Sequence, residues 1–218
     1  MTDDLFADLL PAARPPEVLA PGALWLPGFA LPAADALLAG IASVTARAPL
    51  RRMQTPGGYT MSVAMSNCGA LGWVSDSHTG YRYSPVDPDN GRPWPAMPAG
   101  FLALAARAAA AAGHPDFRPD ACLINRYDVG ARMSLHRDAD EQDFRQPIVS
   151  VSLGLPAVFQ FGGRARGDAV RKLPLAHGDV VVWGGPSRRH YHGVLALKAG
   201  QHPATGECRY NLTFRKAG

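Results

Sequence analysis

The second half of the chain alternates between short apolar runs and polar turns. From residue 122 onward, the apolar runs are four to eight residues long, and Gly, Pro and Asp residues separate them. Short runs of this kind, with no helical repeat between them, are typical of the strands of a sandwich or barrel. The pattern therefore predicts strands at 122–127, 148–155, 158–161, 180–183, 191–197 and 209–215.

The first half combines two helical patterns with a long aromatic segment. Apolar residues recur at helical spacing over 32–46, and an Ala-rich pattern over 101–112 ends at Gly113, so both stretches are predicted to be helices. The residues before them are rich in Pro and Ala and predict an irregular lead-in. Two further strands are predicted, a short one at 24–26 and a longer one at 59–65.

Residues 67–98 carry aromatic, Pro and Gly residues without a clear period. A long irregular segment in a compact domain is usually functional or disordered, and so much aromatic content argues against disorder. We therefore expect a functional lid here, beside two helices that pack on a β-sandwich.

Composition narrows the class of protein. The 218 residues suffice for one domain with a real core, and a formal net charge of +4 indicates a mild preference for polyanions. Three widely spaced Cys and an acidic N-terminus predict a reducing cytoplasm and no signal peptide. The longest uncharged run, 146–163, is broken by Ser, Gly and Pro, so no membrane span is expected.

One His-x-Asp pair has no simple structural explanation. The pair at 114–116 follows the end of a predicted helix, and the pair at 177–179 forms a turn before a predicted strand. The pair of His136 and Asp138 lies in neither position. In an extended chain, residues two apart point to the same side. An imidazole and a carboxylate that converge in this way form two thirds of a facial metal site, and His192 on a later strand would complete it.

Polar residues also repeat at period two on two predicted strands. Arg209, Asn211, Thr213 and Arg215 share one face of the last strand, and Asn125 and Tyr127 share a face of the first. Such a face can simply be turned to water. Two Arg with an Asn and a Thr suit a bidentate carboxylate clamp better than a surface decorated with Lys and Glu.

Ordered stretches from about residue 50 onward carry a more specific signal. They are 55–65, Pro93-Trp94-Pro95, Leu123-Ile124-Asn125-Arg126-Tyr127, Ser134-Leu135-His136-Arg137-Asp138, 147–161, 177–185 and Arg209-Tyr210-Asn211-Leu212-Thr213-Phe214-Arg215. In this order they resemble the bacterial AlkB proteins. These are iron(II)- and 2-oxoglutarate-dependent dioxygenases that remove alkyl groups from nucleic-acid bases.

The resemblance implies a mostly β (α+β) fold, a double-stranded β-helix (jelly roll) with N-terminal helices and a nucleotide-recognition lid. It implies one dioxygenase domain over 1–218, with the lid at about 50–95 and the jelly-roll core at about 120–218. Fe(II) would be held by His136, Asp138 and His192. The cosubstrate 2-oxoglutarate would be bound by Asn125, Tyr127, Arg209, Asn211 and Arg215, and the substrate by Trp73, Tyr81, Tyr83, Asp140 and Arg166.

The implied reaction uses O2 to dealkylate bases such as 1-methyladenine and 3-methylcytosine, and it releases succinate, CO2 and formaldehyde. The expected partner of this monomer is alkylated DNA, preferably single-stranded, with RNA as a second candidate. Two alternatives remain open: an oxygenase that acts on a protein or small molecule, and a non-catalytic jelly roll that binds nucleic acid. A sugar-binding jelly roll is a remote third.

Overall fold

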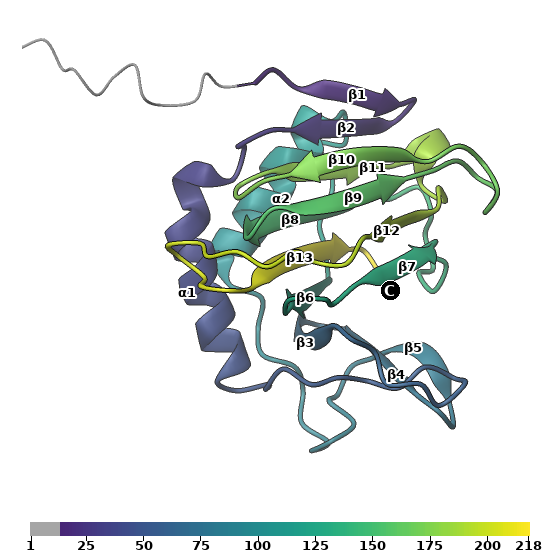
Figure 1. Cartoon of the computed structure of the whole chain (residues 1–218). Coiled ribbons are helices and arrows are strands. Elements are labelled where there is room, and N and C mark those ends of the chain that lie inside the picture. Colours follow the sequence, from purple (N-terminus) through teal and green to yellow (C-terminus); the bar gives the residue numbers. More distant parts are fainter. Residues whose placement is uncertain (1–13) are drawn as a thin grey trace, which may run out of the picture.

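The computed structural model describes residues 14–218, so the first thirteen residues of the predicted lead-in lie outside the described part. Two antiparallel sheets face each other (Figure 1). The large one has the order β1 (Glu17–Ala20), β2 (Ala23–Leu26), β11 (Val180–Trp183), β8 (Ile148–Gly154), β13 (Arg209–Arg215), β6 (Ala121–Tyr127), β3 (Ala64–Gly69). The small one has the order β10 (Arg171–Leu175), β9 (Ala157–Phe161), β12 (His192–Val194), β7 (Met133–His136). The predicted jelly roll is confirmed.

Two helices, α1 (Ala34–Thr45) and α2 (Ala99–Ala111), cover the outer face of the large sheet (Figure 1). Helix α2 buries residues at helical spacing, from Phe101 to Ala109, against β8 and its neighbours. Because β8 and β11 are covered on both faces, every residue of these two strands is buried. The apolar runs that predicted them therefore show no alternation.

Strand β13 is also covered on both faces, but its two faces differ in chemistry. Leu212 and Phe214 pack under the helices, in the same cluster as Ile124 of β6. The intervening side chains, from Arg209 to Arg215, point between the two sheets and are buried there. The polar face of this strand is therefore turned to the interior of the jelly roll and not to bulk water.

Several strands differ from the predicted ones. The strand predicted at 59–65 is wrong: β3 occupies 64–69, where it pairs with residues 121–126 of β6. The strand predicted at 191–197 is shorter, since β12 ends at Val194. Strands β1 and β10 were not predicted, because both are short and carry mixed polar and apolar residues.

The segment expected to be irregular contains a hairpin, β4 (Gly72–Asp76) and β5 (Gly80–Ser84), which forms a separate two-stranded sheet. The Asp76 carboxylate accepts hydrogen bonds from the backbone N–H groups of His78 and Thr79, and Gly80 adopts a positive φ of 72°. This turn chemistry closes the hairpin. In Figure 1 the hairpin lies below the two facing sheets, and β4 contacts β3 and β6 at the edge of the large sheet.

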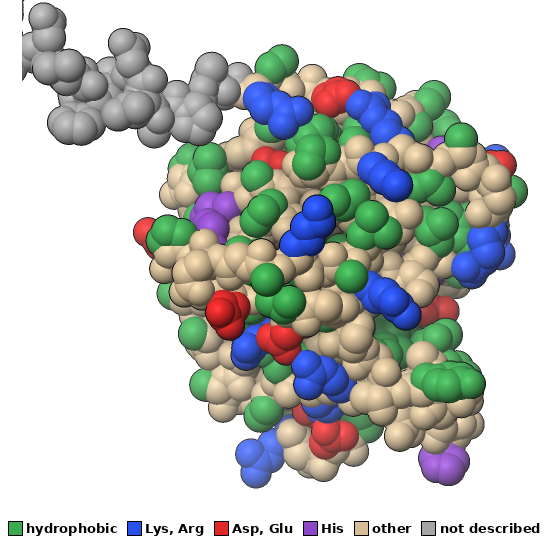
Figure 2. All heavy atoms as spheres, viewed as in Figure 1, with side chains coloured by type: hydrophobic (Ala, Val, Ile, Leu, Met, Phe, Trp, Pro, Cys, Tyr) green, Lys and Arg blue, Asp and Glu red, His purple; other side chains and the backbone are tan. Residues whose placement is uncertain are grey.

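Charged residues are spread over the surface. Figure 2 shows Lys and Arg side chains scattered over the viewed face among apolar and polar ones, and more numerous there than acidic ones. Within residues 14–218, no helix is both long and apolar enough to cross a membrane. The three cysteines are buried and free.

Candidate active site

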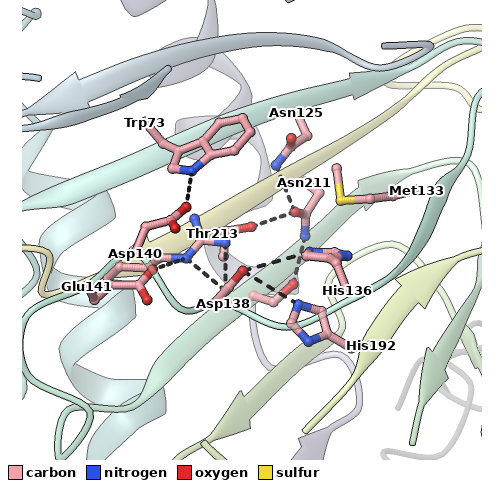
Figure 3. Close-up of polar contacts among 12 residues, drawn as sticks. Trp73, Asn125, Met133, His136, Asp138, Asp140, Glu141, His192, Asn211 and Thr213 are labelled. Atoms are coloured by element: carbon pink, nitrogen blue, oxygen red, sulfur yellow. Dashed lines mark hydrogen bonds and ion pairs between the residues drawn. The ribbon is translucent and has the colours of Figure 1, made fainter. Parts of the chain in front are cut away.

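Three side chains converge between β7 and β12. His192 and His136 are paired directly across these two antiparallel strands, and their ring centroids lie 4.4 Å apart. Asp138 follows β7, which ends at His136, so the carboxylate comes from the segment after the strand and not from the strand itself. The ligand atoms of all three residues lie within 4.8 Å of one another. They form a two-imidazole, one-carboxylate set (Figure 3).

Backbone carbonyls orient both imidazoles. The Nδ1 atom of His136 lies 2.9 Å from the carbonyl oxygen of Ser134, and Nδ1 of His192 lies 3.1 Å from that of His190. A carbonyl only accepts, so each Nδ1 carries the proton and each Nε2 is left as a free lone pair. The two Nε2 atoms lie 3.7 and 3.9 Å from Asp138 Oδ1. This tautomer is the one that binds metal through Nε2.

Arg215 fixes the carboxylate of Asp138 from the other side. Its Nε and Nη2 atoms lie 2.9 and 2.8 Å from Asp138 Oδ2, while Oδ1 faces the imidazoles. Burial alone would raise the pKa of the Asp138 carboxyl, but Arg215 and the two imidazoles hold it well below its usual range. Burial lowers the pKa of His192 to about 3, and the nearby His136 contributes to the shift. Asp138 is therefore ionised and His192 is neutral at neutral pH, as metal binding by these two residues requires.

Arg209 is a buried cation with unused donors. Only 1% of its surface is exposed, and Nη2 donates to Ser152 Oγ at 2.9 Å. Its Nε and Nη1 atoms find no acceptor anywhere in residues 14–218. The Arg209 guanidinium lies 5.0 Å from the centroid of the Tyr127 ring, and burial lowers the pKa of Arg209. A buried Arg without an anion is costly, so these two donors fit the carboxylate of a ligand.

Asn125 and Asn211 line the same cavity as Arg209, His136 and Asp138. Asn125 Nδ2 donates to Asn211 Oδ1 at 3.2 Å, and Asn211 Nδ2 donates in turn to Ser150 Oγ at 2.8 Å. Thr213 also donates to Asn211 Oδ1, whereas Asn125 Oδ1 has no donor within the described residues. This network fixes the polar floor of the pocket and leaves one acceptor available.

The aromatic lid forms the opposite wall. Trp73 of β4 and Tyr81 of β5 are stacked, with ring centroids 5.4 Å apart and an interplanar angle of 20°. Trp73 Nε1 donates to Asp140 Oδ2 at 2.9 Å (Figure 3). Arg166 lies farther out, where its Nη1 donates to the carbonyl oxygen of Leu135 at 2.7 Å. The hydroxyl of Tyr83 donates to Glu141, three residues after the metal ligand Asp138.

One cavity of about 840 Å³ joins these groups. All the residues predicted to bind metal, cosubstrate or substrate line it, except His192, which is buried at its edge. The structure therefore brings the predicted site residues together from both halves of the chain. The donor set suits iron(II), and the unpartnered Arg209 atoms suit a dicarboxylate.

Two buried charged residues of this region were not predicted. Glu141 and Arg188 form an ion pair of 3.0 Å in which each side chain is only 2% exposed. Neither lies in a periodic pattern, and the contact spans 47 residues of sequence. The only local signal was the acidic run of Asp138, Asp140 and Glu141.

This combination of fold and site defines the class of iron(II)- and 2-oxoglutarate-dependent oxygenases. The chain belongs to the 2OG-Fe(II) oxygenase superfamily, whose family model matches residues 22–215, and within it to the AlkB family. It is 62% identical over 215 residues to the alpha-ketoglutarate-dependent dioxygenase AlkB of Escherichia coli, covering 99% of this chain and 98% of that protein.

Two further relatives agree with this assignment. The human nucleic acid dioxygenase ALKBH1 is 34% identical over 122 residues, which cover 56% of this chain and 28% of that protein. The solved structure of OsALKBH1 superimposes with a TM-score of 0.80 at 27% identity, and the match covers 93% of this chain and all of that one.

The protein is therefore an iron(II)- and 2-oxoglutarate-dependent dioxygenase, and the predicted cofactors Fe(II), 2-oxoglutarate and O2 are confirmed. When bound, the metal and cosubstrate supply the activation of O2. The residues that line the cavity around His136, Asp138 and His192 would hold and orient both.

Proposed function

We propose that this enzyme removes alkyl groups from N-alkylated nucleic-acid bases. The observation that carries the proposal is the continuity of one cavity from the His136, Asp138 and His192 triad to the stacked Trp73 and Tyr81. A planar base stacks on an aromatic side chain whatever its sequence context. A base held by this wall would have its edge turned toward the metal ligands.

The acidic side of the pocket favours bases that carry a positive charge. Methylation at N1 of adenine or N3 of cytosine leaves the ring cationic and keeps an exocyclic amine. Asp140 can accept a hydrogen bond from that amine, and Trp73 can stack on the cationic ring. We therefore propose 1-methyladenine and 3-methylcytosine as the preferred lesions.

The target base must leave its stack to reach a metal between two sheets, so a single strand costs less than a duplex. We propose single-stranded alkylated DNA as the preferred substrate, RNA as a second one, and a monomeric, cytoplasmic enzyme. In this proposal residues 50–95 act as the nucleotide-recognition lid of a single domain, over a catalytic core at 120–218, with Tyr81, Tyr83 and Arg166 along the strand. The scattered basic side chains support contact with a polyanion (Figure 2).

Likewise, we propose that Arg209 and Tyr127 hold the distal carboxylate of 2-oxoglutarate. Asn125, Asn211 and Arg215 would line the rest of its site. The two unused donors of Arg209 and the free acceptor of Asn125 support this placement.

Mass spectrometry of a single-stranded oligonucleotide with one 1-methyladenine tests the proposal. After incubation with enzyme, Fe(II), ascorbate and 2-oxoglutarate, the oligonucleotide should lose the mass of one methylene unit, with one succinate formed per lesion repaired. The Asp138→Ala protein and an unmethylated oligonucleotide are the controls. An unchanged lesion, together with 2-oxoglutarate turnover on a peptide or small molecule, would instead favour a different substrate class.

A further inference from the structure

A chain of buried polar contacts leads from the lid to the metal ligand Asp138. It begins at Tyr83 on β5, whose hydroxyl donates to Glu141 Oε1 at 2.8 Å. The same oxygen lies 3.3 Å from Arg215 Nε. Arg215 in turn contacts Asp138 Oδ2 through both Nε and Nη2. Glu141 and Arg215 thus connect the lid with the Asp138 carboxylate, which faces the two imidazoles.

The middle of this chain is fixed to the core. The other oxygen of Glu141, Oε2, accepts from Arg188 Nη2 at 3.0 Å. Arg188 also donates through Nε to the carbonyl oxygen of Gln146 at 2.9 Å. The side chains of Glu141 and Arg188 are 2% exposed, and those of Arg215 and Asp138 are 8% and 9% exposed. Water cannot easily replace a lost partner here, so each contact restrains the next one.

The lid touches the segment after the metal ligands at two adjacent residues. Trp73 contacts Asp140, and Tyr83 contacts Glu141. A base that stacks on Trp73 and bonds to Asp140 engages both partners of the first contact. The second contact is made by Tyr83, on the neighbouring strand of the same hairpin. A shift of the hairpin would therefore change the hydrogen bond between Tyr83 and Glu141.

We infer that Glu141 is a positioning residue that couples the position of the lid to the geometry of the metal ligand Asp138. With Tyr83 in place, Glu141 Oε1 is shared between two donors, and Arg215 keeps both of its contacts with Asp138. Without the tyrosine hydroxyl, Oε1 attracts Arg215 Nε more strongly, and the Asp138 carboxylate becomes freer to rotate. The coupling rests on the proposed function only for the identity of the ligand that moves the lid.

Cobalt(II) binding tests the coupling without catalysis. Co(II), added together with 2-oxoglutarate, is the probe, and its visible absorption reports both its affinity and its coordination geometry. The informative variant is Tyr83→Phe, and its matched control is Tyr81→Phe, two residues away on the same strand. Tyr81 stacks on Trp73 and, unlike Tyr83, has no contact with Glu141 in the described structure, so the phenyl ring preserves its role.

We expect Tyr83→Phe to weaken Co(II) binding by roughly threefold to tenfold and to shift the absorption bands, because one buried hydrogen bond is lost. Glu141→Gln should weaken it by about tenfold or more, in the range found for other partners of metal ligands. Tyr81→Phe should leave both affinity and spectrum unchanged. Identical Co(II) affinity and spectra for Tyr83→Phe and wild type would overturn the inference.

A second arm adds the oligonucleotide that carries 1-methyladenine, with binding followed by fluorescence anisotropy. In wild type the bound oligonucleotide should change the Co(II) spectrum, and in Tyr83→Phe it should bind without that change. If wild type does not bind the oligonucleotide, the proposed substrate is wrong, while the effect of Tyr83→Phe on Co(II) alone still decides the coupling. If it binds and the spectrum of wild type stays constant, the coupling is wrong.

Discussion

Trp73 Nε1 donates a hydrogen bond to Asp140 Oδ2 at 2.9 Å, and this contact joins the lid to the segment that carries the metal ligands. Asp140 has two carboxylate oxygens, and the indole engages one of them. The exocyclic amine of a base can bond to the second oxygen or replace the indole. In either case the carboxylate is already aimed at the aromatic wall before a base arrives.

The first prediction concerns the choice of lesion. Asp140→Ala should slow repair of 1-methyladenine and 3-methylcytosine by roughly tenfold or more, because a charge-assisted hydrogen bond is lost. Repair of the neutral 1-methylguanine and 3-methylthymine should change much less, since a carbonyl replaces the amine. Initial rates on four oligonucleotides that differ only in the lesion measure this. An equal loss on all four would make Asp140 a structural partner of Trp73.

The second prediction concerns the metal ligands. His136→Ala, Asp138→Ala and His192→Ala should each abolish turnover while the protein stays folded, because two ligands cannot hold the ion in a facial site. Succinate formation and far-ultraviolet circular dichroism are the measurements. His78→Ala, at the exposed turn of the hairpin, is a matched control that should retain activity. Turnover by the Asp138→Ala protein would contradict the assignment of Asp138 as a metal ligand.

The third prediction concerns the cosubstrate. Arg209→Lys keeps the charge but loses the planar pair of donors, so the apparent KM for 2-oxoglutarate should rise by about tenfold or more. Affinity for the oligonucleotide should change little. The control is Arg126→Lys, on the neighbouring strand, whose guanidinium pairs with Asp128. An unchanged KM would mean that another cation holds the distal carboxylate.

The fourth prediction concerns the pH dependence of stability without metal. Burial and the neighbouring His136 lower the pKa of His192 to about 3, whereas an unfolded His titrates near ~6.5. Between these values the unfolded chain binds a proton that the folded chain does not. The contribution of His192 to the free energy of unfolding should therefore fall as the pH drops through this window, by at most ~1.4 kcal/mol per pH unit.

Urea unfolding of the metal-free protein between pH 7 and pH 5 measures this slope. The carboxyl of Asp138, whose pKa is also lowered, contributes only at lower pH, below ~4. His192→Gln removes the titrating group and should flatten the profile. Equal slopes for both proteins would show that His192 is protonated in the fold.

The sequence by itself determined the elements with a clear apolar run or alternation, and the residues with a specific chemistry. The strands at 180–183 and 209–215, the polar face of the latter, and the His136, Asp138 and His192 set could be read from spacing and residue type. The resemblance to a known family supplied the candidate roles around them. Local physics suffices here, because alternation and turn residues act within a few positions of one another.

Only the tertiary structure decided where β3 begins, how the aromatic segment pairs as a hairpin, and which buried charges meet. Glu141 touches Tyr83, Arg188 and Arg215, which lie 58, 47 and 74 residues away along the chain. No periodicity in the sequence encodes such contacts. They arise because two sheets and a hairpin exclude water from one volume, and each buried charge there must find its partner across the fold.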